Sequence, residues 1–170
     1  MTGKAGIYDR MRKMDSVMIF ADLAQVVGAF AVVAAVVVAV RQYQLNIRIT
    51  RARIVAEFLN AYHADKDMQD IFYALEYGVF KYDIHFAGSK DERKLDSLLG
   101  HFNGLARWWS VGILKSDDLR VVDYYLCLIM RSPEVDRYFR VLKGYAKQQN
   151  RDFLFRFLVE FWDEREKRNA

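Results

Sequence analysis

The sequence predicts an all-α protein in which an N-terminal transmembrane helix continues into a cytoplasmic bundle of five or six helices. Three observations lead to this fold class: one long apolar run at residues 17–40, apolar residues at helical spacing after it, and no segment with the alternation of a β-strand. The 170 residues include one proline and nine glycines. That composition excludes a collagen-like repeat and disfavours a turn-rich β-sandwich.

Residues 17–40 form the predicted membrane span. Only Asp22 and Gln25 are strongly polar there, and Val26–Val40 contains no polar side chain. At about 1.5 Å per residue, the run is long enough to cross a hydrocarbon core of about 30 Å. A core helix of a soluble bundle is one alternative, although it would need neighbours on every side. A cleaved signal peptide is another, but the run exceeds a secretory h-region and residues 37–39 form a poor cleavage site.

The predicted organisation has four segments: a basic N-terminal tail at 1–16, the transmembrane helix at 17–40, a helical soluble domain at 41–162 and a charged C-terminal tail at 163–170. Four Lys and Arg residues flank each side of the span, so the excess of positive charge does not decide its orientation. Cys127 is the single cysteine and cannot form an internal disulfide. We therefore expect a single-pass protein of the cell inner membrane with its C-terminal domain in the cytoplasm.

The helix that leaves the membrane is expected to continue into the soluble domain. Polar residues recur there at spacings of three and four, which draws one polar stripe along an otherwise apolar helix. This stripe contains Asn46, Thr50, Arg53, Glu57 and Asn60. Arg53 and Glu57 are four residues apart and are expected to form a favourable exposed pair.

Later helices are predicted from their start and stop signals. Asp67 is expected to cap a helix that stops near Gly78, and the next helix is expected to run from about Lys90 to Gly112. Ser116 is expected to start another. The pair Ser132-Pro133 is the clearest start, since it combines a hydroxyl N-cap with proline at the first helical position. The final helix is expected to bury Phe153, Leu154, Phe157, Leu158, Phe161 and Trp162, before a solvated tail.

Small residues share one face of the predicted span and would let a second helix approach closely. They are Ala24, Gly28, Ala31, Ala35 and Ala39. This face predicts self-association of the transmembrane helix, with the common use of alanine in membrane helices as the alternative.

An ionisable residue inside a membrane span suggests a functional site, and Asp22, with Gln25 one turn later, is the candidate here. Hydration of Asp22 near the membrane interface is the alternative reading.

Three cations, Arg41, Arg48 and Arg51, lie on one side of the exit helix and are expected to contact anionic lipid. Nucleic-acid binding would need basic residues interleaved with exposed aromatics, whereas the aromatics here have core spacing, so no nucleic-acid partner is expected.

Trp108 and Trp109 point about 100° apart on a helix, so either one marks a partner surface or they face two parts of the core.

No residue pattern assigns a reaction, a metal or a cofactor. His63, His85 and His101 are isolated, and Cys127 has apolar neighbours typical of an inert buried thiol. The acidic cluster that begins at Asp65 lacks the glycine that a calcium loop requires at its sixth position. The sequence therefore predicts a protein that is not an enzyme.

A resemblance extends over about Leu23–Lys143. It is carried by AQVVGAFAVVAAVVVAVRQYQLNIR, FLNAYHADKDMQDIFYALEYG, LDSLLGHFNGLARWWSVGILKSDDL and SPEVDRYFRVLK. These segments resemble a bacterial family of small, single-span, membrane-anchored all-helical proteins catalogued as a domain of unknown function. The resemblance implies a helical domain in the cytoplasm and offers no catalytic residue to transfer.

Two functional hypotheses follow, and a third, an enzyme acting at the membrane surface, is disfavoured because no nucleophile, base and orienting group can be assembled from the sequence. The first is a membrane-anchored protein-interaction or scaffold module without catalysis, whose partners are the lipid bilayer and either further copies of the chain or a protein of a membrane complex. The alternative is a ligand-gated membrane effector of the antiphage-defence type, in which oligomerised anchors perturb the bilayer.

Overall fold

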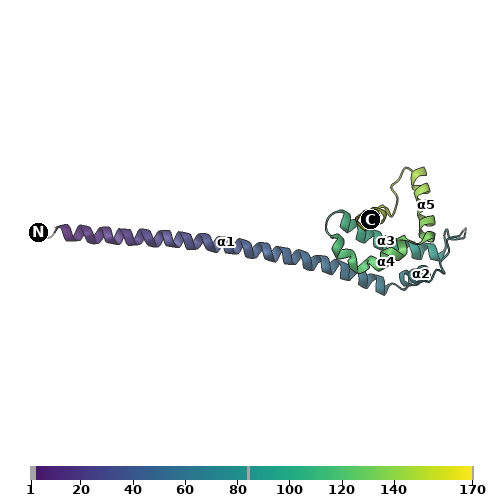
Figure 1. Cartoon of the computed structure of the whole chain (residues 1–170), viewed down its shortest axis with the longest axis horizontal. Coiled ribbons are helices and arrows are strands. Elements are labelled where there is room, and N and C mark those ends of the chain that lie inside the picture. Colours follow the sequence, from purple (N-terminus) through teal and green to yellow (C-terminus); the bar gives the residue numbers. More distant parts are fainter. Residues whose placement is uncertain (1–2, 84, 170) are drawn as a thin grey trace. The chain divides into compact units, whose positions relative to one another are not determined.

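The protein is built from six α-helices and one short 3-10 helix, with no β-strand in the part of the chain that the structure describes (Figure 1). The computed structural model describes residues 3–83 and 85–169, with side chains described for residues 25, 28, 30–83 and 85–168. The elements are α1 (Gly3–Ala64), α2 (Lys66–Glu76), α3 (Lys90–Ser110), η1 (Ser116–Val122), α4 (Asp123–Met130), α5 (Pro133–Gln148) and α6 (Arg156–Asn169). The predicted all-α class is confirmed.

The chain divides into two compact units, the first ending at Ile49 and the second beginning at Thr50. Helix α1 runs through this boundary without a break, as the polar stripe predicts. The predicted boundary at residues 40–41 therefore lies inside a helix, and residues 3–16, expected as a tail, are its first turns.

The first unit contains the predicted membrane helix. Among the residues whose side chains are described, one helical segment, Phe30–Ala64 of α1, is both long enough and apolar enough to cross a membrane. Its apolar side chains are exposed, for example Phe30 at 72% and Val36 at 57%. Such a surface is unfavourable in water, which is consistent with a membrane anchor near the N-terminus.

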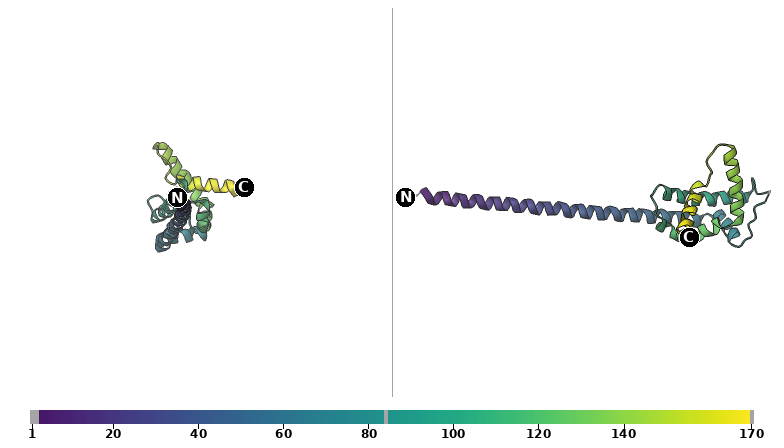
Figure 2. Two further views of the ribbon diagram at one scale, coloured as in Figure 1. Left: turned by 90° about the vertical axis from the view of Figure 1, so that its left-hand side faces the viewer. Right: turned by 45° about the horizontal axis from the view of Figure 1, so that its top comes forward.

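The core of the second unit is centred on α3, which packs against α2 and α6 (Figure 2). Leu95, Leu98 and Leu99 lie on one face of α3 and are completely buried. The next turn places Phe102 against Phe58 of α1, edge to face, with 5.1 Å between ring centroids. The last turns of α1 are therefore part of this core.

The helices start near the predicted residues, but the side chains predicted to cap them do not always make the capping hydrogen bond. Asp65, and not Asp67, caps α2, because its carboxylate accepts a hydrogen bond from the Met68 amide at 3.0 Å. Asp67 instead pairs with Lys94 at 3.0 Å. Ser132 does hold the N-cap position of α5, with Pro133 next to it, but its hydroxyl makes no capping bond. Gly112 follows α3 with a φ of 77°, as predicted for a C-terminal glycine.

Two later segments differ from the prediction. The chain after Ser116 first forms the 3-10 helix η1 and becomes α-helical only at Asp123. Helix α6 begins at Arg156, so Leu154 precedes it and is 65% exposed instead of buried. The expected C-terminal tail is the end of α6, where the Arg165 side chain is only 19% exposed.

Asn103 of α3 explains where α6 starts. Its side-chain oxygen accepts from the Leu158 amide at 3.1 Å, and its side-chain nitrogen donates to the Leu154 carbonyl at 3.3 Å. The start of a helix leaves amides without intrahelical partners, and an acceptor on a neighbouring helix can satisfy one of them. The side-chain amide group of Asn103 thus holds the start of α6 against α3.

We expect Asn103→Ala to lower the free energy of unfolding by about 1–2 kcal/mol, because a buried helix start loses its acceptor. Thermal or chemical unfolding of the detergent-solubilised chain, followed by circular dichroism, measures this. Asn60→Ala, at an exposed position on α1, is the control. Equal stability of the two variants would contradict the capping role.

Candidate functional site

An apolar groove lies between the last turns of α1 and the C-terminal half of α3. It has a volume of about 250 Å³ and is lined by Ile54, Glu57, Phe58, His101, Gly104, Leu105 and Trp108. Gly104 leaves it open, because a Cβ added there would meet no atom within 4 Å. Trp108 is 41% exposed beside it. The groove is therefore a hollow with a large, partly free aromatic side chain at its edge.

His101 forms an uncharged wall of this groove. Its ring stacks on Phe58 with 4.0 Å between centroids and 13° between planes, and its Nε2 lies 3.0 Å from the Phe58 carbonyl oxygen. Burial lowers the pKa of His101, and the Phe58 carbonyl and Asp65 oppose this only in part. The neutral ring donates from Nε2 to that carbonyl, which leaves the groove apolar near neutral pH.

The two adjacent tryptophans have different surroundings. Trp109 packs edge to face on Phe161 of α6 at 5.0 Å, and its indole N–H donates to the Ser116 hydroxyl at 3.3 Å. Trp108 lines the groove and stays partly exposed. The structure therefore favours the reading in which one indole is available to a partner, and the partner itself stays a prediction.

A second, polar cavity of about 240 Å³ lies among α3, η1, α4 and α6. Its charged lining residues are Asp117, Arg120, Asp123, Glu164, Arg165 and Arg168. Arg165 pairs with Asp123 at 3.1 Å, and Arg168 pairs with Glu164 at 3.5 Å. Three acids balance three cations, so the cavity has no strong preference for either charge.

Arg165 is the least satisfied cation of this cavity. Its Nη1 atom is buried and lies 3.9 Å from the Glu166 carboxylate, too far for a hydrogen bond. Burial acts to lower the pKa of Arg165, but Cys127 and Asp123 outweigh it and the pKa is raised. A buried donor without an acceptor calls for a bound water or ligand oxygen.

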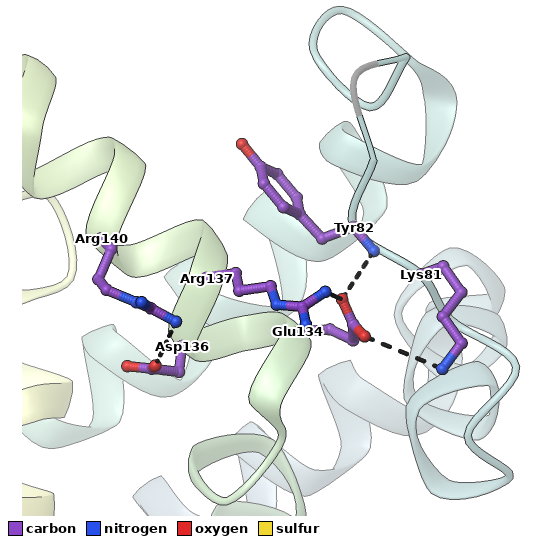
Figure 3. A network of polar contacts seen from close by, with 6 residues as sticks. All are labelled: Lys81, Tyr82, Glu134, Asp136, Arg137 and Arg140. Carbon is purple, nitrogen blue, oxygen red and sulfur yellow. Dashed lines mark hydrogen bonds and ion pairs between the residues drawn. The ribbon is translucent and has the colours of Figure 1, made fainter.

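Other buried polar groups hold the fold together. Glu134, at the start of α5, accepts from the Tyr82 amide at 3.1 Å and lies 3.4 Å from Arg137 and 3.9 Å from Lys81 (Figure 3). Figure 3 shows that this carboxylate joins α5 to the connection before α3. In the described part of the chain, the cavity next to Glu134 is lined by no second acid and no histidine. We therefore assign Glu134 a structural role.

Asp96 and Tyr138 form a second structural pair, in which the tyrosine hydroxyl donates to the carboxylate at 2.6 Å. Burial raises the pKa of Asp96, with a smaller contribution from Glu92, while the Tyr138 bond opposes it. Burial also raises the pKa of Tyr138 well above its usual value, and its bond to Asp96 adds to this. The pair joins α3 to α5.

The predicted lipid-contact residues do not all behave alike. Arg41 and Arg48 are exposed, whereas Arg51 is 19% exposed and its Nε lies 3.9 Å from Asp118 of η1. The second unit therefore takes Arg51 into its own packing, and we no longer assign it to lipid.

The predicted self-association face is open where it is described, since Gly28, Ala31, Ala35 and Ala39 are exposed. Gln25, of the predicted intramembrane polar pair, is exposed as well. The side chains of Asp22 and Ala24 lie outside the described residues. Their predicted roles remain predictions.

No group of three or more histidine, cysteine or carboxylate side chains is placed to hold a metal in the described chain. His63 and His85 are exposed, and Cys127 is half-buried near Arg165. Comparison with protein-family models, with curated proteins and with solved structures finds no match. The site must therefore be interpreted from its own geometry.

The groove and the cavity arginines were not predicted from the sequence. A signal for the groove does exist, because Gly104 interrupts the interior of a long helix, where glycine is unfavourable without a packing reason. No signal marks Arg165, since its burial depends on how α6 packs.

His101 gives the stability a specific pH dependence. Its folded pKa lies below the value of about 6.5 for an unfolded histidine, so the unfolded chain binds the proton first and His101 destabilises the fold as pH falls below that value. His101→Phe should keep the stacking on Phe58 and reduce the loss of melting temperature between about pH 7.5 and pH 5. His85→Phe, at an exposed site, is the control; an unchanged loss in the His101 variant would contradict the assignment.

Proposed function

We propose that this protein is a single-pass, membrane-anchored helical scaffold that acts by self-association and not by catalysis. The observation that carries the proposal is the apolar groove between α1 and α3, with Trp108 exposed beside the open space at Gly104. Partly exposed aromatic side chains beside apolar hollows are typical centres of protein interfaces.

A second copy of the chain is the occupant that the groove fits best. A two-fold interface uses the same patch on both subunits, so the patch must contain both a protruding group and a hollow. Trp108 supplies the first and the space over Gly104 supplies the second, so the indole of each copy can enter the groove of the other. Exposed Arg53 and Glu57, paired at 2.8 Å, supply a polar rim on α1.

Membrane anchoring favours this association. Confinement of both copies to one membrane raises their effective concentration, so a small interface is sufficient. The exposed small residues Gly28, Ala31, Ala35 and Ala39 support the same partner, because they allow two spanning helices to approach closely. The small-residue face of the first unit and the groove of the second unit thus both support binding of a second copy of the chain.

The proposed location is the bacterial inner membrane, with the second unit in the cytoplasm. The single free cysteine, Cys127, and the lack of any possible internal disulfide support a reducing compartment. The resemblance to the family of single-span helical proteins described above gives the same orientation. Within this proposal, Arg41 and Arg48 contact anionic headgroups at the membrane surface.

A photo-crosslinking residue in place of Trp108, used in native membranes, should give an adduct of twice the 20.0 kDa chain mass. Gly104→Leu should abolish this adduct, because its side chain fills the hollow and removes a contact worth about 2 kcal/mol or more. The fold should tolerate the change, since the added Cβ meets no atom.

Gly100→Leu is the matched control, because Gly100 is on the same helix, is equally open and does not line the groove. This variant should keep the adduct. An adduct with a different protein would contradict self-association, and no adduct at all would contradict an interface at the groove.

One observation favours a second candidate function, the ligand-gated membrane effector. Arg165 lines the polar cavity, and its buried Nη1 makes no hydrogen bond although Glu166 lies 3.9 Å away, so a small ligand with an acceptor oxygen would satisfy it. Ligand binding there would act on α6 and η1, and the small-residue face of α1 would let oligomerised anchors perturb the bilayer.

A membrane-potential dye tests this candidate in cells that express the chain under phage infection. The effector hypothesis predicts a loss of potential that Gly28→Leu prevents, because leucine keeps the spanning helices apart. An unchanged potential, or a loss that persists in the variant, counts against it.

A further inference from the structure

Three tyrosines on α2 and α4 present their rings to solvent. Tyr77 is 74% exposed, Tyr124 is 58% exposed and Tyr73 is 49% exposed. Tyr73 and Tyr77 are four residues apart on one face of α2, and their rings stack with 6.3 Å between centroids. We refer to Tyr73, Tyr77 and Tyr124 as the tyrosine patch. Exposed aromatic rings that lie together are typical of a binding surface.

Packing between α2 and α4 joins these rings into one surface. Phe72 links them, because its ring centroid is 6.0 Å from that of Tyr73 and 6.3 Å from that of Tyr124. Phe72 itself is 2% exposed, so this core residue contacts one patch tyrosine from each helix. The tyrosine patch is therefore positioned by the packing of the second unit.

A carboxylate lies within the tyrosine patch. Glu76 is three residues after Tyr73, on the same face of α2, and accepts a hydrogen bond from the Tyr124 hydroxyl. This bond is the largest of the effects that raise the pKa of Tyr124, and nearby Tyr77 also contributes. The hydroxyl therefore remains a donor to Glu76, and one negative charge is held among the three rings.

No cation of the described part of the chain forms an ion pair with Glu76. The carboxylates earlier in α2 are different, since Lys94 of α3 binds both Asp67 at 3.0 Å and Asp70 at 2.9 Å. One ammonium group against two carboxylates leaves that group of three residues with a negative charge as well. The patch and the helix that carries it are therefore acidic.

The nearest cations along the chain do not reverse this charge. Lys66 is seven residues before Tyr73, which is about 10 Å of helix, and α2 as a whole has this one cation against three carboxylates. Arg120 of η1 lines the polar cavity, which no residue of the tyrosine patch lines. The cations that follow α2 and α4 lie beside acids of their own: Lys81 beside Glu134 and Arg131 beside Glu166.

An arginine side chain is the group that fits this combination best. The face of an aromatic ring attracts a cation, and a guanidinium group stacks well on such a face. The planar fork of arginine also binds a carboxylate through two parallel hydrogen bonds, which Glu76 can accept. Phosphate groups would be repelled by the acidic surroundings, so nucleic acid and anionic lipid are disfavoured as occupants.

The openness of the tyrosine patch favours a polypeptide over a free small cation. A single exposed cation–π contact changes a binding constant only about two- to fivefold. A small cation on such an open surface would therefore dissociate readily. A protein segment adds contacts beside its arginine, and arginine is among the residues enriched in protein interfaces.

We propose that the tyrosine patch and Glu76 form a docking site for an arginine-bearing segment of a partner protein. None of these four residues lines the groove at Trp108, so the site is separate from the proposed self-association surface. The proposal goes beyond that function, because it gives the scaffold a second kind of partner. It does not depend on how the second unit lies relative to the membrane.

The experiment titrates the full chain, in an uncharged detergent and at one ionic strength, into fluorescent peptides followed by anisotropy. One peptide consists of glycine, serine and several arginines, and two matched peptides carry citrulline or lysine in place of every arginine. Citrulline has the shape of arginine without its charge. We expect the arginine peptide to bind most tightly and the citrulline peptide to bind least.

Variants of the chain then test the patch itself. Tyr77→Leu should weaken binding of the arginine peptide about two- to fivefold, whereas Tyr77→Phe keeps a ring and should keep the affinity. Glu76→Gln should weaken binding as well, although glutamine can still accept the Tyr124 hydroxyl. Tyr145→Leu and Glu160→Gln are the matched controls, at exposed sites on α5 and α6, and should bind as the unchanged chain does.

Equal binding of the arginine and citrulline peptides would overturn the proposal, and so would unchanged affinity in Tyr77→Leu. Equal binding of the lysine peptide would overturn the assignment to arginine. If Tyr77→Leu also removes the self-adduct formed at position 108, a second copy occupies the patch and the proposal is wrong. Loss of that adduct in Gly104→Leu without any change in peptide binding concerns self-association alone, so failure of either proposal is distinguishable.

Discussion

The packing of other helices against α3 is the interaction on which the second unit depends, because α2, α6 and the last turns of α1 all contact it. Phe58 and Tyr62 of α1 both pack against Phe102, with ring centroids 5.1 and 6.5 Å apart. One helix thereby serves two environments: its earlier residues are apolar on every side, and its last turns have a single apolar face. Removal of α1 would therefore remove part of the core as well as the anchor.

Charge in the second unit is largely neutralised within the unit. Lys94 of α3 binds Asp67 and Asp70 of α2 at 3.0 and 2.9 Å, and these bonds raise its pKa to about 12. Arg165 and Arg168 are similarly matched by acids. The apolar groove at Trp108 has no such internal match, which is why the proposed self-association concerns α3.

Local signals in the sequence were reliable where one residue decides the structure. Gly112 ends α3, Pro133 begins α5, and Arg53 pairs with Glu57 as expected. They were less reliable where two candidates compete within one turn, as when Asp65 and not Asp67 caps α2. The register of α6 required Asn103, a residue 53 positions before the start of that helix (Arg156 against Asn103), and no local pattern contains such a contact.

Periodicity and composition are properties of neighbouring residues, so they were sufficient to predict the helical class, the long apolar helix and its continuation into the second unit. Tertiary structure alone decided which of two adjacent tryptophans is exposed, that Arg51 belongs to the core side of α1, and that Arg165 is buried. The groove at Gly104 also exists only because α1 and α3 are packed together. Burial is a property of pairs of helices, and the residues that create it are distant in the chain.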